Sequence, residues 1–83
     1  MRYNLIRKYA ISIMEVNVKK LKELRRLRAL SQQELADSAG VGRNTVSRIE
    51  RGESGAHGRT LRRLAGALGV DVSELVRIEA EDA

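Results

Sequence analysis

The sequence contains no cysteine, no proline, no tryptophan and no phenylalanine. The absence of cysteine excludes a disulfide framework and any zinc site built from thiolates, and a lone histidine, His57, excludes a histidine-rich metal site. Two tyrosines, Tyr3 and Tyr9, are the only aromatic residues, which argues against an all-β sandwich. No apolar run approaches the roughly 18 residues that a membrane span needs. We therefore expect no metal and no cofactor.

The chain has 83 residues, which suits one small domain and leaves no room for two separate cores. Its hydrophobic content of 42% is that of a globular protein rather than of a disordered one. The formal net charge is +5, and arginine outnumbers lysine by twelve to four. A basic, arginine-rich domain points to nucleic acid, an anionic membrane surface or an acidic protein as its partner.

Apolar residues recur at helical spacing along most of the chain. The pattern predicts five helices, over residues 18–30, 31–40, 43–51, 59–68 and 72–78. In the first of them, Leu21 and Leu24 are expected at the centre of the buried stripe, with Leu27 at its margin. Three glycines within residues 52–58 predict a flexible loop between the third and fourth helices.

Capping residues mark where these helices begin and end. Asn17 is placed to cap the first helix. Ser31 and Glu34 have the spacing of a capping box, in which each side chain bonds the backbone N–H of the other residue. Gly40 is placed to end the second helix in the left-handed conformation.

Residues 31–51 combine a capped helix, a short turn and a second helix. Val46 and Ile49 face inward on the second helix, so its opposite face is polar and carries Arg43, Asn44, Ser47 and Arg48. A helix fits the major groove of B-DNA, where arginine can donate twice to guanine and asparagine can pair with adenine. The alternative is that these four side chains form an ordinary solvated helix face.

Two stretches of the sequence resemble a known family. Residues 30–52, LSQQELADSAGVGRNTVSRIERG, resemble the helix–turn–helix of Cro and lambda repressor, the XRE family, and residues 60–75, TLRRLAGALGVDVSEL, resemble the closing part of the same domain. The likeness covers about residues 18–78 and implies an all-α, five-helix DNA-binding bundle. It also implies a cytoplasmic transcription regulator, most simply a repressor, that binds double-stranded DNA as a homodimer and has neither enzymatic activity nor a membrane partner.

The resemblance assigns roles to individual positions. It implies base contacts by the four polar residues of helix 43–51. It implies contacts with the DNA backbone by Gln32, Thr45, Arg59 and Thr60. Arg25 and Glu50 match a basic–acidic pair that links the first helix to the end of the third in relatives, the alternative being a surface pair that contributes little to stability.

The sequence departs from the family pattern at two places. Gly42 stands where Ser or Thr is usual, so a side-chain contact with phosphate is not expected there. The loop of residues 55–58 lacks the proline that commonly precedes the fourth helix, so phosphate contacts from Arg59 and Thr60 are expected to be less preorganised.

The first 17 residues fit two kinds of structure. Leu5, Ile6, Tyr9, Ala10 and Ile13 follow helical spacing, whereas the alternation from Tyr9 to Ile13 fits a strand. The expected organisation is an N-terminal extension of residues 1–17, a helix–turn–helix domain of residues 18–78 and an acidic tail of residues 79–83. Met1 and Met14 are both candidate translation starts.

Other functions stay open on the sequence alone. An antitoxin, or another interaction module with the same domain, would bind DNA and also hold a protein partner through residues 1–17. Alternatively, residues 9–16 would pair as strands across a dimer. RNA binding fits the charge, but the aromatic residues that stack on bases are missing. No set of residues has the pattern of a catalytic nucleophile with its base or of a phosphate-binding glycine loop, so enzymatic activity is not expected.

Overall fold

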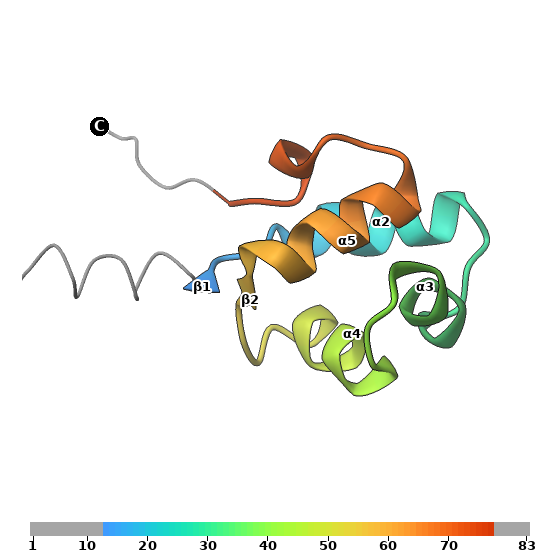
Figure 1. Ribbon diagram of the computed structural model, residues 1–83, viewed down its shortest axis with the longest axis horizontal. Coiled ribbons are helices and arrows are strands. Elements are labelled where there is room, and N and C mark those ends of the chain that lie inside the picture. Colours follow the sequence, from blue (N-terminus) through green and yellow to red (C-terminus); the bar gives the residue numbers. More distant parts are fainter. Residues whose placement is uncertain (1–12, 78–83) are drawn as a thin grey trace, which may run out of the picture.

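The computed structural model describes residues 13–77. Over that part of the chain, four α-helices, one 3-10 helix and a two-stranded sheet make up a mostly helical fold (Figure 1). The elements are β1 Ile13–Met14, α2 Val18–Leu27, α3 Gln32–Ala39, α4 Arg43–Glu50, β2 Ala56–His57, α5 Gly58–Leu68 and the 3-10 helix η1 Val72–Glu74. The predictions made for residues 1–12 and for the acidic tail of residues 79–83 lie outside the described residues.

The predicted five-helix bundle is wrong at its last element, because over residues 13–77 the α-helices number four. A helix was expected over residues 72–78, and within the described part of that range, residues 72–77, only the single 3-10 turn η1 is helical. After this turn Val76 pairs with Val16 in an isolated antiparallel bridge, and the backbone N–H of Arg77 donates to the carbonyl of Glu15 at 2.9 Å. Extended pairing with the segment before α2 therefore replaces a second helical turn.

The sheet joins the start of the described chain to the loop after α4. β1 and β2 run antiparallel, with Ile13 opposite His57 and Met14 opposite Ala56. The strand alternative thus holds for this end of the N-terminal segment, and its pairing partner is the chain's own β2. Gly55 allows the close approach, because a Cβ there would lie 2.3 Å from the backbone oxygen of Met14. The expected flexible loop is therefore partly an ordered strand, with Ala56 buried.

One hydrophobic core lies between the helices and extends to the segments that flank them. Its largest fully buried side chains are Leu21, Leu35, Val46, Ile49, Leu61, Leu64, Leu68 and Leu75. Leu21 and Leu24 are both buried, as predicted, whereas Leu27 at the margin of the stripe is 75% exposed. None of the helices in residues 13–77 has the length and apolar character to cross a membrane.

The predicted helix ends are confirmed where side chains define them. The side chain of Asn17 accepts from the backbone N–H of Lys20 at 3.1 Å. Ser31 and Glu34 form both hydrogen bonds of the capping box, and Gly40 ends α3 with a left-handed φ of +73°. Of these caps, Gly40 is the one at the turn that leads from α3 to α4.

The end of α2 has an unusual residue in the left-handed conformation. The N–H of Ala29 donates to Arg26 and the N–H of Leu30 donates to Arg25, which is the hydrogen-bond pattern of a Schellman motif. Glycine is common at such a position, yet Ala29 has a φ of +54°. The turn between α2 and α3 therefore holds a strained alanine.

Candidate nucleic-acid interface

One side of α4 is fixed in the core and the other faces outward. Val46 and Ile49 are fully buried, and Glu50 is also buried at the end of the helix. Because these three positions lie on one side of the helix, the residues on its opposite side point away from the core. α4 lies beside α3 on one face of the molecule (Figure 1).

The outward side of α4 brings together the four residues expected to contact bases. Arg43, Asn44 and Arg48 are exposed and Ser47 is half-buried. With Arg51 they line one open concavity on the surface. This concavity therefore carries three guanidinium groups, one amide and one hydroxyl, which are the donors and acceptors that match base edges in the major groove.

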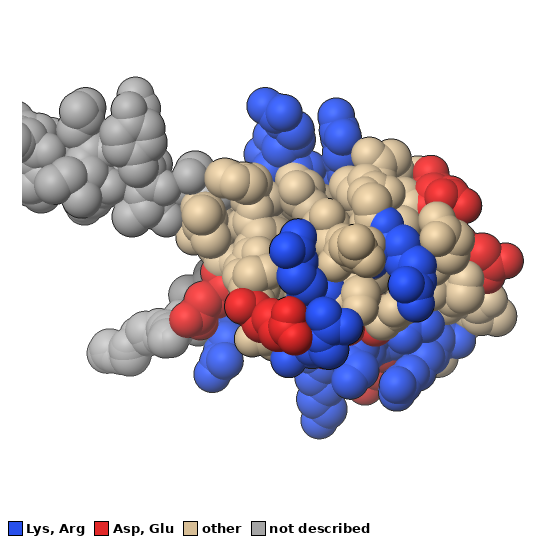
Figure 2. Space-filling model, turned by 90° about the horizontal axis from the view of Figure 1, so that it is seen from below, with Lys and Arg blue, Asp and Glu red and all other residues tan. Residues whose placement is uncertain are grey.

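The basic side chains on the face that α3 and α4 form come from α4, because α3 has no Lys or Arg and α4 with its C-cap carries Arg43, Arg48 and Arg51. Figure 2 views the molecule from below Figure 1 and shows Lys and Arg side chains in and around this face, most densely along the lower edge of the view, with Asp and Glu in smaller groups. Phosphate groups are attracted to such a surface, and their binding releases counterions from DNA. The electrostatics and the donor pattern of α4 thus favour the same ligand.

Arg51 and Glu53 were not among the residues that sequence reasoning selected. Arg51 donates from Nη1 to Ser47 Oγ at 2.7 Å, and it contacts Glu53 from Nε at 2.7 Å and from Nη2 at 3.2 Å. Hydrogen bonding with Arg51 lowers the pKa of Glu53 below its ordinary value. The spacing of four residues from Ser47 to Arg51 is visible in the sequence, but Glu53 lies beyond the helix, where helical spacing predicts nothing.

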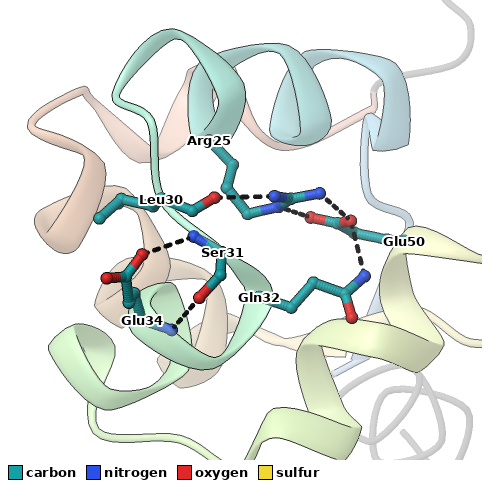
Figure 3. Close-up of polar contacts among 6 residues, drawn as sticks. All are labelled: Arg25, Leu30, Ser31, Gln32, Glu34 and Glu50. Atoms are coloured by element: carbon teal, nitrogen blue, oxygen red, sulfur yellow. Dashed lines mark hydrogen bonds and ion pairs between the residues drawn. The ribbon is translucent and has the colours of Figure 1, made fainter.

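Arg25 and Glu50 contact each other between α2 and the end of α4 (Figure 3). Arg25 Nε and Nη2 donate to the two carboxylate oxygens at 2.7 and 2.9 Å. A third donor, Nη1, reaches the backbone carbonyl of Leu30 at 2.8 Å. The side chains of Arg25 and Glu50 are 13% and 3% exposed, so this is a shielded pair rather than a surface pair.

The pKa of Glu50 reflects two opposing effects. Burial by itself would raise the pKa, because it disfavours the charged carboxylate. Hydrogen bonds from Arg25 and Gln32, together with the positive charges of Arg25 and Lys22, outweigh burial and leave the pKa below its ordinary value. Hydrogen bonding with Glu50 in turn raises the pKa of Arg25. Both groups are therefore charged in the folded protein at neutral pH.

The four residues expected to contact the DNA backbone lie on three different helices. Gln32 begins α3, is half-buried and donates from Nε2 to Glu50 at 3.0 Å (Figure 3). Thr45 lies half-buried on α4. Arg59 and Thr60 lie in the first turn of α5, where they line a second open concavity with His57. The concavity beside α4 includes none of these four residues.

α5 is tied to the turn of the helix pair. Arg63 on α5 donates from Nη1 to the backbone carbonyl of Gly40 at 3.3 Å. At the other side of that turn Gly42 precedes α4 in an extended conformation and has no side chain to offer a phosphate. The turn is thus held from α5, while no side chain caps the start of α4.

Comparisons with known proteins agree with this geometry. The HTH_3 family model, described as helix-turn-helix, matches residues 21–75. Over 57 residues the chain is 40% identical to the cryptic phage CTXphi transcriptional repressor RstR of Vibrio cholerae, an alignment that covers 69% of this chain and 51% of that protein. The chain thus spans about half the length of that relative.

Two solved structures are similar over the same part of the chain. The restriction-modification controller protein C.AhdI from Aeromonas hydrophila has a TM-score of 0.66 and 35% identity, with 69% of this chain and 86% of that chain covered. SinR, a master regulator for biofilm formation whose crystal structure is in complex with DNA, has a TM-score of 0.66 and 29% identity. The alignment covers 69% of this chain and 95% of the SinR chain.

Proposed function

This chain belongs to the helix-turn-helix family of DNA-binding transcription regulators, of the XRE type, and from that premise we propose that it is a repressor that reads a specific operator in the major groove with α4. The observation that carries the proposal is the two-sided character of α4. Its buried side is locked in the core by Val46 and Ile49, while its outward side gathers donors and acceptors in one concavity.

The side chains on α4 differ in their hydrogen-bonding groups, so each would contact a different base. Arg43 and Arg48 each have the planar fork of donors that fits O6 and N7 of guanine. The amide of Asn44 both donates and accepts, which fits N7 and the N6 amino group of adenine. Ser47 adds a hydroxyl between them on the same face.

Contacts with phosphates would set the position of α4 in the groove. We assign these contacts to Gln32, Thr45, Arg59 and Thr60. The Nε2 atom of Gln32 carries two hydrogens, and since one bonds Glu50, the other is available to a phosphate oxygen. Arg59 is exposed and cationic at the first turn of α5, where the helix dipole also attracts an anion.

The ion pair of Arg25 and Glu50 would act as a strut for the recognition helix. It joins α2 to the last residue of α4 and, through Gln32, to the first residue of α3. A fixed end of α4 keeps its polar face at one angle to the domain, which base reading requires because hydrogen bonds weaken steeply with misalignment.

The family also supports a homodimer that binds two half-sites, with residues 18–78 as the DNA-binding domain. Two-fold symmetry in the protein would be mirrored in the operator as a palindrome. The centres of the half-sites would then lie one helical turn apart, about 10 base pairs, or a multiple of that distance.

Selection of bound sequences from random DNA, followed by binding to the selected operator at several salt concentrations, tests the proposal. We expect a defined palindromic sequence. We also expect the logarithm of the binding constant to fall linearly with the logarithm of the salt concentration, with a slope of about −0.9 for each phosphate contacted. Recovery of no preferred sequence, with equal binding to every DNA, would contradict specific recognition.

A further inference from the structure

The guanidinium of Arg51 lies between two partners at the C-terminal end of α4. Its Nε and Nη2 face the two carboxylate oxygens of Glu53, at 2.7 and 3.2 Å, in the two-point geometry that arginine forms with carboxylates. Its remaining nitrogen, Nη1, donates to Ser47 Oγ at 2.7 Å. The carboxylate thus holds the guanidinium in the position from which it reaches the hydroxyl.

The backbone delivers Glu53 to this position. The N–H of Gly52 donates to Ile49 at 2.9 Å and the N–H of Glu53 donates to Arg48 at 3.0 Å, which together form a Schellman motif. Gly52 has the left-handed φ of +75° that the motif requires. The chain therefore turns back at the end of α4 and places Glu53 beside the helix.

The contact with Arg51 constrains what the hydroxyl of Ser47 can do. A serine hydroxyl has one hydrogen to donate and two lone pairs that accept. Arginine has only donors, so Arg51 occupies a lone pair of the hydroxyl and leaves its hydrogen for another group. A charged donor also polarises the hydroxyl, which makes it a better donor and a poorer acceptor.

We infer that Arg51 and Glu53 are positioning residues for specificity, which hold Ser47 as a hydrogen-bond donor toward the DNA. The hydroxyl would then prefer an acceptor on a base edge, namely N7 of a purine, O6 of guanine or O4 of thymine, over the amino groups of cytosine and adenine. This inference rests on the proposed function, because it assumes that α4 enters the major groove with Ser47 facing a base pair.

A double-mutant cycle on the full chain tests the inference. The probes are the operator selected from random DNA and its single-base-pair variants. Ser47→Ala identifies the base pair that Ser47 reads. At that base pair we expect the ratio of the affinity for the operator to the affinity for its single-base-pair variant to fall about 3- to 10-fold, the effect of one hydrogen bond. Glu53→Gln and Arg51→Lys should each weaken the preference at that same base pair. In the Ser47→Ala background neither should weaken it further.

Two features of the variants keep the result interpretable. Arg51→Lys retains the positive charge but lacks the fork that bonds Glu53 and Ser47 together, so general attraction to DNA is kept. Glu23→Gln on α2 is the matched control for Glu53→Gln, because Glu23 is also exposed and its loss changes the net charge equally. The control should leave the preference unchanged.

The outcomes separate this inference from the proposed function. If wild-type protein prefers no sequence, the proposed function itself fails. If it prefers an operator but Ser47→Ala changes no base preference, or if Glu53→Gln and Arg51→Lys leave the preference at the Ser47 base pair intact, the inference alone is overturned. A uniform loss of affinity on all DNAs with Arg51→Lys and no change in preference would make Arg51 a phosphate contact instead.

Discussion

Arg25 on α2 and Glu50 at the end of α4 are 25 residues apart in the sequence and form two hydrogen bonds of 2.7 and 2.9 Å in a shielded position. The carboxylate also accepts from Gln32 at 3.0 Å, and the guanidinium also donates to the carbonyl of Leu30. Three helices and one turn thus meet at this pair. The pair therefore links the end of α4 to α2 and to the start of α3.

Arg25→Met should strongly destabilise the fold. The substitution leaves the carboxylate of Glu50 buried and unpaired, which costs about 3–5 kcal/mol in the free energy of unfolding. Urea unfolding followed by circular dichroism measures the loss. Lys20→Met is the matched control, because the Lys20–Glu74 pair at 3.4 Å is solvent-exposed, and its loss should cost less than about 1 kcal/mol. Similar small losses in both variants would show that the Arg25–Glu50 pair is not a strut.

The lowered pKa of Glu50 predicts how stability depends on pH. Its stabilising contribution is fully present above the pKa of the unfolded chain, about 4.3, and is lost as the pH falls through the lower pKa of the folded state. Wild-type protein should therefore lose more unfolding free energy than Glu50→Gln between roughly pH 5 and pH 3. Urea titrations at several pH values measure this difference. A rise in the stability of wild-type protein relative to Glu50→Gln upon acidification would mean that burial dominates and that the folded pKa is raised.

Ala29→Gly should stabilise the protein. Ala29 has a φ of +54°, and the left-handed conformation costs a residue with a Cβ about 1–2 kcal/mol. Glycine removes that strain but gains entropy in the unfolded chain, so the net stabilisation is expected at about 0.5–1 kcal/mol. Thermal unfolding should show a melting temperature higher by several degrees. An unchanged or lower value would show that the turn holds Ala29 without strain.

Gly55→Ala and Gly66→Ala should have opposite effects. A Cβ at residue 55 would lie 2.3 Å from the backbone oxygen of Met14, so β1 must move and stability should fall by about 1–3 kcal/mol. A Cβ at residue 66 meets nothing within 4 Å inside α5, so alanine should add about 1 kcal/mol through helix propensity. Equal effects of the two substitutions in chemical denaturation would contradict the pairing of β1 with β2.

Local signals in the sequence were sufficient for most of the helical fold. The capping box of Ser31 and Glu34 and the buried pair Leu21 and Leu24 depend on residues three or four apart, so they can be predicted from spacing. The polar side of α4 follows in the same way from the burial of Val46 on its inner side.

Features that depend on distant partners could not be predicted in this way. Two-residue strands have too few positions for an alternating pattern, and β1 exists because β2 lies next to it in the folded chain. The prediction of a fifth helix failed for a related reason, because Val76 forms an antiparallel bridge with the distant Val16 instead of continuing a helix. The role of Glu53 depends on a turn that begins after α4, where the helical period no longer applies.

If the outward side of α4 reads bases, as we propose, Asn44→Ala should lower sequence preference more than general affinity for DNA. Affinity is measured by gel shift for wild type and variant, on the selected operator and on a scrambled DNA of the same length. Arg59→Ala serves as the comparison, because its proposed contact is with phosphate and it should weaken both DNAs alike. For Asn44→Ala we expect the ratio of operator affinity to scrambled-DNA affinity to fall roughly 5- to 150-fold, with binding to scrambled DNA nearly unchanged. Equal losses on the two DNAs would contradict the claim.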